Sequence, residues 1–131
     1  ARRGLVLVDP PFERKDEFAA LLKGLKDGYR RFATGIFVLW YPIKDRPPVD
    51  AFHKTLAQSG IRRILAVELL LRPPTDPDRL NGCGLIVINP PWQLDSDLGR
   101  LVADLGAIFG VVSQTGAKPG RTSAAWWIVG E

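Results

Sequence analysis

A short apolar run near the start of the chain, Leu5 to Val8, ends abruptly in an acid and two prolines. Four apolar residues closed by a breaker are typical of a buried strand in a parallel sheet. Pro10 and Pro11 cannot donate ladder hydrogen bonds, so the strand must end at Asp9. Because ligands of open α/β sheets bind beyond the carboxyl ends of the strands, Asp9 is predicted to face a ligand site.

The rest of the chain alternates helix-like and strand-like segments. Helices are expected over residues 16–32, 49–60 and 95–110, strands over 36–41, 61–71, 84–89 and 125–129, and loops over 44–48, 72–82 and 113–122. These assignments follow from apolar residues at helical spacing and from continuous apolar runs closed by glycine or proline. Such alternation favours an α/β fold with a parallel sheet, in which the final strands include an antiparallel one.

The composition fits one soluble globular domain, or part of one. The chain has 131 residues, of which 46% are hydrophobic and 24% charged, and its net charge of +4 is compatible with a nucleic-acid partner. Cys83 is the only cysteine, which rules out an internal disulfide and favours a reducing, cytoplasmic compartment. No membrane span or signal peptide is recognisable. The chain starts without methionine, so we expect it to be a piece of a longer protein.

The residues Asp9, Pro10, Pro11 and Phe12 have the chemistry required for methyl transfer to an aromatic amine. The nitrogen of such an amine is a poor nucleophile, because its lone pair is delocalised into the ring. The Asp9 carboxylate and the rigid Pro10 carbonyl can accept its two hydrogens, and Phe12 can stack on the base. The four residues match the [DNS]-P-P-[YFW] pattern of amino methyltransferases that use S-adenosylmethionine.

A second copy of this pattern, Asn89-Pro90-Pro91-Trp92, follows another apolar run. If Asn89 were in the active site, a glycine-rich cofactor loop should follow the first strand, where Asp9 stands instead. No G-x-G-x-x-G loop occurs anywhere in the chain. We therefore favour Asp9 as the site and expect Asn89 to Trp92 to form a structural turn.

Other candidate sites are weaker. His53 is expected on a helix surface. Glu68 interrupts an apolar strand; a position at a strand end or in a pocket is one alternative for it, and a solvent-facing position is the one we expect. No metal site is indicated by the spacing of the histidine, the cysteine and the carboxylates. The cations considered for phosphate contacts are Lys23, Lys26, Arg30, Arg31, Lys44 and Arg46.

Several stretches succeed one another in a way that resembles one known family. They are Asp9-Pro10-Pro11-Phe12-Glu13, Gly28 to Gly35, Leu39-Trp40-Tyr41-Pro42, Gly60 to Leu65, Ile86 to Trp92 and Trp127-Ile128-Val129. Together they resemble the RlmJ-type 23S ribosomal RNA adenine-N6 methyltransferases of bacteria. The resemblance covers essentially the whole chain and corresponds to the carboxyl-terminal half of that family.

The resemblance implies a class I methyltransferase (Rossmann-like) fold, with a seven-stranded sheet and helices on both faces. Residues 1–131 would be the carboxyl-terminal part of a single catalytic domain, with S-adenosylmethionine as cofactor and 23S ribosomal RNA as substrate. It also implies that Asp9, Pro10, Pro11 and Phe12 are catalytic, that Asp9 contacts the cofactor, and that no metal or membrane is involved. Residues 1–131 alone are expected to be inactive, to bind the cofactor weakly and to self-associate.

Two alternatives stay open at this point. The first is an amino methyltransferase that acts on DNA adenine or on protein glutamine. The second is a non-catalytic RNA-binding module with the same fold, in which Asp9 would be dispensable.

Overall fold

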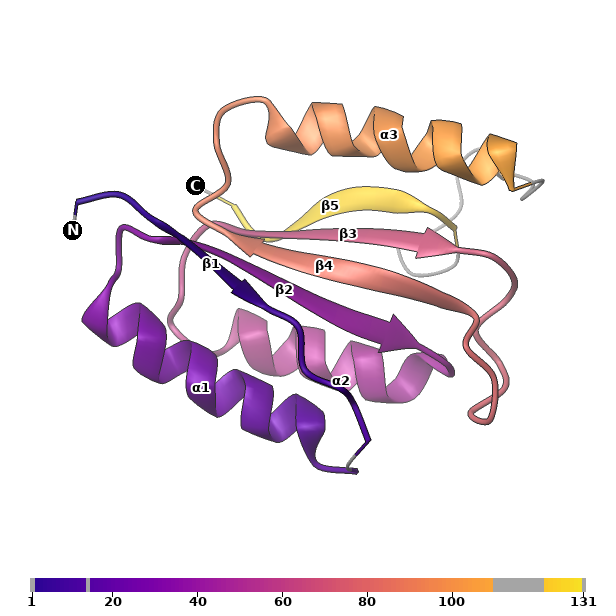
Figure 1. Cartoon of the computed structure of the whole chain (residues 1–131), viewed down its shortest axis with the longest axis horizontal. Helices are drawn as coiled ribbons and strands as arrows, with labels where there is room; N and C mark the ends of the chain where they lie inside the picture. Colours follow the sequence, from indigo (N-terminus) through magenta and orange to yellow (C-terminus); the bar gives the residue numbers. More distant parts are fainter. Residues whose placement is uncertain (1, 14, 110–121, 131) are drawn as a thin grey trace.

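The computed structural model describes residues 2–13, 15–109 and 122–130, which form a five-stranded sheet and three helices (Figure 1). In chain order the elements are β1 (Leu5–Val8), α1 (Glu17–Arg31), β2 (Ile36–Ile43), α2 (Arg46–Ala57), β3 (Ile64–Leu70), β4 (Gly82–Ile88), α3 (Leu94–Ile108) and β5 (Ala124–Val129). The predicted α/β class is confirmed, and every predicted helix and strand is present. The predicted loop over 113–122 lies outside the described residues, apart from Thr122.

The sheet has the strand order β1-β2-β4-β3-β5. β1 and β2 are parallel and joined by α1, whereas β4 is inserted antiparallel between β2 and β3, and β5 runs antiparallel to β3. The sheet is therefore more antiparallel than the alternation of elements predicts. The reason is the short connection between β3 and β4, residues 71–81, which forms a hairpin because a parallel crossover needs about a dozen residues or more, usually as a helix.

Helices cover both faces of the sheet. Figure 1 shows α1 and α2 on one face and α3 on the other. Leu21 and Leu25 of α1 pack with Phe52 and Leu56 of α2 in one apolar cluster, as their helical spacing predicts. Val102 of α3 packs in a second cluster on the opposite face.

The helical spacing of the apolar residues in α3 predicts a buried stripe made of Leu98, Leu101, Val102, Leu105 and Ile108, and this prediction is only partly correct. Leu98 and Val102 pack against the sheet, but Leu101 and Ile108 are 49% and 75% exposed. The helical periodicity predicts a wider buried stripe than the structure has, because α3 touches the sheet mainly over β3 and β5.

Two element boundaries differ from the predictions because of prolines. β2 continues through Pro42, whereas the sequence predicts that it ends before this residue. β1 pairs with β2 only as far as Leu39, so the side of β2 that faces β1 is unpaired at Pro42 and needs no N–H donor there. α2 begins at Arg46 rather than Val49, because proline is tolerated in the first turn of a helix.

Candidate active site

The turn after β1 places the predicted catalytic residues at the carboxyl edge of β1 and β2. β1 ends at Val8, the side chains of Asp9 and Pro11 are exposed, and Pro10 and Phe12 are half-buried. Phe12 has a φ angle of +52°, in the left-handed region that bulky residues rarely adopt. The Asp9 carboxylate is thus accessible to a ligand, and the same turn holds Phe12, three residues later, in a sparsely populated backbone conformation.

The Phe12 ring is fixed by edge contacts with two other aromatic rings. Its centroid lies 5.1 Å from that of Phe18 at the start of α1 and 6.2 Å from that of Trp40 on β2, both in T-shaped geometry. Such pairs add about 0.5–1.5 kcal/mol to what burial contributes. Phe12 is therefore held in place before any ligand arrives.

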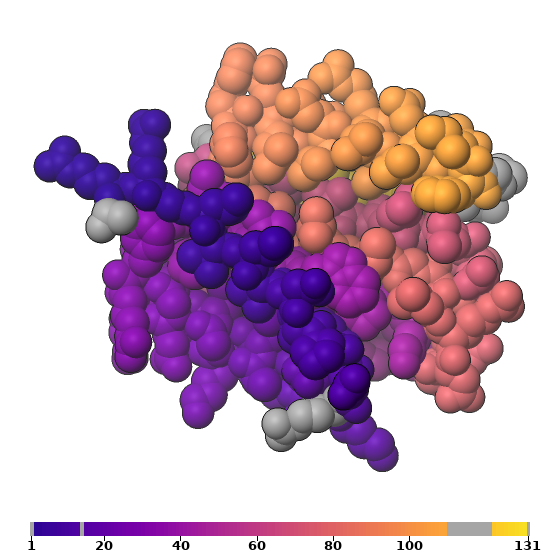
Figure 2. Space-filling view, viewed as in Figure 1, coloured from indigo at the N-terminus to yellow at the C-terminus, as the bar shows by residue number. Residues whose placement is uncertain are grey.

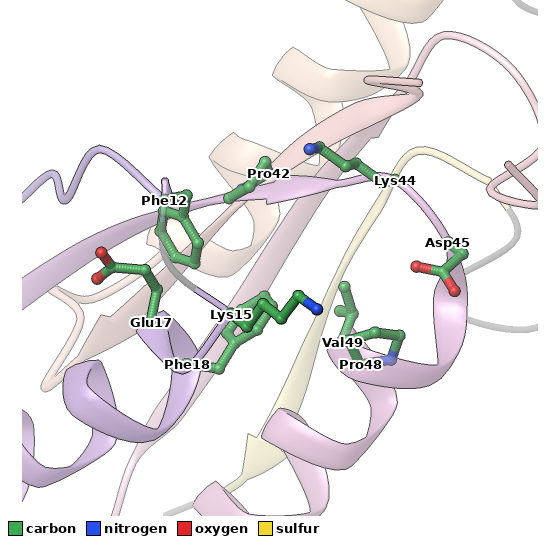
Figure 3. A pocket seen from close by; sticks show the side chains of 9 residues that line it. All are labelled: Phe12, Lys15, Glu17, Phe18, Pro42, Lys44, Asp45, Pro48 and Val49. Carbon is green, nitrogen blue, oxygen red and sulfur yellow. The ribbon is translucent and has the colours of Figure 1, made fainter. Parts of the chain in front are cut away.

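A shallow hollow of about 160 Å³ adjoins Phe12 (Figure 3). It is lined by Phe12, Lys15, Glu17, Phe18, Pro42, Lys44, Asp45, Pro48 and Val49. Its walls therefore come from the turn after β1, the start of α1, the end of β2 and the first turn of α2. The hollow is below the roughly 300 Å³ at which small-molecule sites usually begin, so it suits part of a ligand rather than a whole cofactor.

The long hairpin loop is tied to the same end of β2 by Asn81. This residue is 1% exposed, its N–H donates to the Ile43 carbonyl (2.8 Å), and its Nδ2 donates to the Lys44 carbonyl (2.5 Å). These bonds hold Lys44, which lines the hollow, at a defined position. Nothing in the sequence singled out Asn81.

A buried polar network lies beneath this edge, on the face covered by α2. Glu68 of β3 is completely buried and accepts hydrogen bonds from the Tyr41 hydroxyl (2.6 Å) and from Nη1 of Arg46 (2.6 Å). The Arg46 guanidinium also donates to Asp50 (2.8 Å), and Nε2 of His53 lies 3.0 Å from the Tyr41 hydroxyl. Since the hydroxyl has one proton and gives it to Glu68, it must accept from His53, which assigns the Nε2–H tautomer.

Burial and charge set the protonation of this network. Burial, and then the nearby Arg46 cation, lower the pKa of His53 from 6.5 to about 4, although Asp50 opposes this. Burial, followed by the charge of Glu68, raises the pKa of Tyr41 well above 10. Burial tends to lower the pKa of Arg46, but hydrogen bonds and charge from Glu68 outweigh it and raise the pKa. His53 is therefore neutral at pH 7.

Two predictions from the sequence are wrong at this network, and one of the cations considered for phosphate contacts is already paired. Glu68 does not face solvent, because its position in β3 points toward α2. His53 is not on the helix surface: only 12% of its side chain is exposed, and its ring contacts those of Tyr41 and Trp126. Arg46 is not available for phosphate, because its side chain, 16% exposed, pairs with Glu68 and Asp50.

The network positions one wall of the hollow. Arg46 is the first residue of α2, and Asp45, Pro48 and Val49 line the hollow beside it. Anchoring Arg46 to Glu68 on β3 therefore fixes the start of α2 against the sheet. An acid in an otherwise apolar strand was the available sequence signal, but its partners lie far apart in the chain.

The second Pro-Pro motif lies at the opposite edge of the sheet. Asn89 follows β4 with a φ angle of +55°, and its Nδ2 donates to the carbonyls of Ala33 (2.8 Å) and Gly35 (2.9 Å). Its N–H donates to the Arg63 carbonyl (3.1 Å). Both amide hydrogens of the side chain thus join two connections, which supports a structural role for Asn89; Trp92 of the same motif is 86% exposed.

Two findings concern only the described part of the chain. It holds no group of three or more His, Cys, Asp or Glu side chains able to bind a metal ion together. None of its helices is long and apolar enough to cross a membrane.

Comparison with known proteins places the whole arrangement in one family. A family model described as "Ribosomal RNA large subunit methyltransferase D, RlmJ" matches residues 1–127. Proteins named ribosomal RNA large subunit methyltransferase J, from Haemophilus influenzae and Escherichia coli, are 44% and 43% identical over 77% and 78% of this chain. The chain spans only 36% of the length of each.

A crystal structure of a Legionella pneumophila protein of family DUF519 has a similar fold. It superposes with a TM-score of 0.76 at 29% identity, over 98% of this chain and 44% of the other. The α/β architecture described above is therefore also found in a solved structure of a longer protein.

Proposed function

Because the chain belongs to the RlmJ family of ribosomal RNA large subunit methyltransferases, we propose that it holds the acceptor base in such an enzyme. The proposed reaction transfers a methyl group from S-adenosylmethionine to the N6 amine of an adenine in 23S ribosomal RNA. The observation that carries this proposal is the exposed Asp9 carboxylate at the carboxyl end of β1, followed by the fixed ring of Phe12. Residues 1–131 would be the carboxyl-terminal part of the catalytic domain.

The proposed role of the motif is to hold and orient the amine. The Asp9 carboxylate and the Pro10 carbonyl are acceptors for its two hydrogens, and this favours a pyramidal nitrogen whose lone pair points away from the ring. Pro11 stiffens the turn that carries both acceptors. Phe12 stacks on the adenine, so positioning supplies much of the rate enhancement.

One residue of this edge is a candidate contact for the proposed cofactor. S-adenosylmethionine, when bound, supplies an electrophilic methyl group on a sulfonium. Asp9 is the residue of this chain that would contact it, since an exposed carboxylate suits the N–H donors of the cofactor's amino group. Asp9 can also accept the proton that the methylated amine must lose.

Methylation of RNA transcripts by full-length variants tests the proposal. We expect Asp9→Ala to remove most turnover with little loss of cofactor affinity, because Asp9 would make only one of the cofactor's contacts, whereas it is one of the two acceptors for the amine. Asp9→Asn should retain part of the activity, since an amide oxygen is also an acceptor. Asn89→Ala is the matched control at the second motif: it should act through stability, visible as a lower melting temperature.

The result also separates the alternatives. Full activity of Asp9→Ala together with an inactive but stably folded Asn89→Ala would place the site at the second motif. Transfer of labelled methyl to DNA or to protein, and not to RNA, would exclude the proposed substrate. If every variant binds RNA normally and none transfers a methyl group under any condition, the chain is an RNA-binding module.

A further inference from the structure

The edge of the sheet opposite Asp9 brings together five connections of the chain. The start of β1, the turn from α1 to β2, the turn from α2 to β3, the turn from β4 to α3 and the end of β5 all lie at this end of the molecule (Figure 1). Hydrogen bonds join them: Thr34 donates to the Arg2 carbonyl (3.2 Å), Asn89 bonds to residues 33, 35 and 63, and Nη2 of Arg63 donates to the Pro90 carbonyl (3.2 Å). The edge is one defined surface rather than a set of loose loops.

Three of these connections each contribute a pair of arginines. We define the arginine edge as Arg2, Arg3, Arg30, Arg31, Arg62 and Arg63, together with Trp92, which lines a hollow with Arg63. All are exposed except Arg63, which is partly buried. Two described acids lie beside these segments: Asp27 pairs with Arg30 (3.6 Å), and Asp95, which lines the hollow with Trp92, accepts a hydrogen bond from Trp127 (3.3 Å) and keeps its charge, so the cations outnumber the acids at this edge.

The helix dipole accounts for only two of these six arginines. Arg30 and Arg31 lie in the last turn of α1, where the helix dipole favours cations. Arg2, Arg3 and Arg62 make no ion pair with any described residue, and folding brings them near the other cations. Like charges gathered in this way repel one another unless an anion binds them.

Trp92 adds a flat apolar surface to the same edge. Its side chain is 86% exposed, and it lines a hollow of about 430 Å³ together with Arg63 and Trp127. Exposed tryptophan next to arginine is the pairing that single-stranded nucleic acid uses: guanidinium groups bind phosphates, and the indole stacks on a base. A base inside an A-form duplex is not available for such stacking.

We propose that the arginine edge is a second RNA-binding surface, which binds phosphates through its arginines and stacks an unpaired base on Trp92. The choice of RNA as the ligand rests on the proposed function. The proposal extends that function, because the arginine edge is separate from the Asp9 edge. β1 separates the two edges: Arg3 precedes this strand and Asp9 follows it, six residues later, so the two lie at most about 20 Å apart. The arginine edge therefore contacts a different segment of the RNA from the one that carries the target adenine.

RNA binding by full-length variants tests this surface. We expect Trp92→Ala to bind labelled 23S ribosomal RNA transcripts roughly 5- to 150-fold more weakly, and Trp92→Phe to retain most of the affinity because a ring remains. Arg62→Ala and Arg3→Ala should each lower the slope of log affinity against log salt by about one. Matched controls are Arg79→Ala in the hairpin between β3 and β4 and Ile108→Ala at the end of α3, which are exposed away from this edge and should change neither quantity.

Length of the RNA gives a second readout. A short oligonucleotide that contains only the target adenine cannot reach both edges, so the Trp92→Ala and Arg62→Ala variants should methylate it as well as the unchanged protein does. On the long transcript the same variants should show a raised KM with kcat nearly unchanged, as for lost uniform binding.

Failure of this inference is distinguishable from failure of the proposed function. Unchanged affinity and salt slope in folded Trp92→Ala, Arg62→Ala and Arg3→Ala would overturn the second surface, whatever Asp9→Ala does. Weakened binding in these variants, with no methyl transfer by the unchanged protein, would support the surface and overturn the proposed reaction. Equal weakening by Arg79→Ala would overturn the surface as well, since binding would then follow net charge only.

Discussion

Phe12 combines a packing task with its proposed stacking task. Its ring contacts Phe18 and Trp40 by their edges and lies beside the hollow at the end of β2. We expect Phe12→Ala to lower kcat/KM for RNA by the value of one base–aromatic stack, about 1–3 kcal/mol, or roughly 5- to 150-fold. Phe12→Tyr and Phe12→Trp should be tolerated, because each keeps the ring.

Steady-state kinetics with thermal melts in parallel checks this prediction. The melts are needed because Phe12→Ala also removes aromatic contacts. A variant that melts lower but keeps full kcat/KM would show that Phe12 only packs, and would leave stacking on the base to another residue.

His53 gives the fold a specific dependence on pH. Its pKa is about 4 in the folded protein and about 6.5 when exposed, so the unfolded chain binds a proton more readily. The contribution of neutral His53 to stability is therefore complete above pH 6.5 and is lost as the pH falls toward 4. Over this window the loss approaches about 3 kcal/mol.

Denaturant unfolding at a series of pH values measures this loss. His53→Gln keeps a hydrogen-bond donor near Tyr41 but cannot take up the proton, so its stability should fall less steeply between pH 6.5 and 4. If both proteins lose stability in parallel, acidic groups elsewhere control the effect and not His53.

At the scale of the elements, a single glycine on β4 allows β2 and β3 to share the network. A Cβ at Gly84 would overlap the ring of Tyr41, so only glycine leaves room for that ring to cross β4 and reach Glu68. We expect Gly84→Ala to lower the free energy of unfolding by about 1–3 kcal/mol through overpacking.

Gly24 is the matched control for this substitution. It lies on α1, and a Cβ added there would meet nothing within 4 Å, so Gly24→Ala should raise stability by about 0.5–1 kcal/mol through helix propensity. Urea melts of the two variants should therefore shift in opposite directions. A Gly84→Ala protein as stable as the unchanged one would mean that Tyr41 can leave Glu68 at little cost.

The sequence predicted those features that depend on neighbouring residues. The strand stop at Asp9, the motif that follows it and the stripe of α1 are local patterns, and each was located correctly. The partners of Glu68 were missed because they depend on β4 entering between β2 and β3, a pairing of segments far apart in the chain that no local pattern encodes. The catalytic roles of Asp9 to Phe12 stay predictions until variants are tested.

At the scale of the whole molecule, the two ends of the sheet differ in chemistry. The carboxyl edge of β1 presents an exposed acid, an aromatic ring and a shallow hollow, whereas the opposite edge presents arginines and Trp92. The body between them is a three-layer sandwich held by β2, which reaches both ends. If both edges contact RNA, the distance between the two contacts is set by the rigid sheet and not by a flexible linker.

The remaining long side of the molecule is the outer edge of β1, and it is apolar. Leu5 and Leu7 are 68% and 69% exposed, because α3 covers its face of the sheet mainly over β3 and β5, away from β1. In Figure 2 the indigo start of the chain lies beside the orange helix and not beneath it. On the opposite face, Val6 and Val8 line an apolar hollow of about 380 Å³ against α1. β1 pairs on one side only, since it ends the strand order.

An unpaired apolar edge of this kind is a template for pairing with another strand. We therefore expect residues 1–131, studied alone, to self-associate in a concentration-dependent way. Leu7→Lys should reduce association, because a charge on an edge strand opposes strand addition.

Leu101→Lys is the matched control: Leu101 is also exposed but lies on α3, away from any strand edge, so this change should leave association unaltered. Sedimentation velocity over a range of concentrations distinguishes the outcomes. A chain that stays monomeric at every concentration would show that the β1 edge is protected by its short length, whereas equal effects of both substitutions would show that association follows overall charge and not strand pairing.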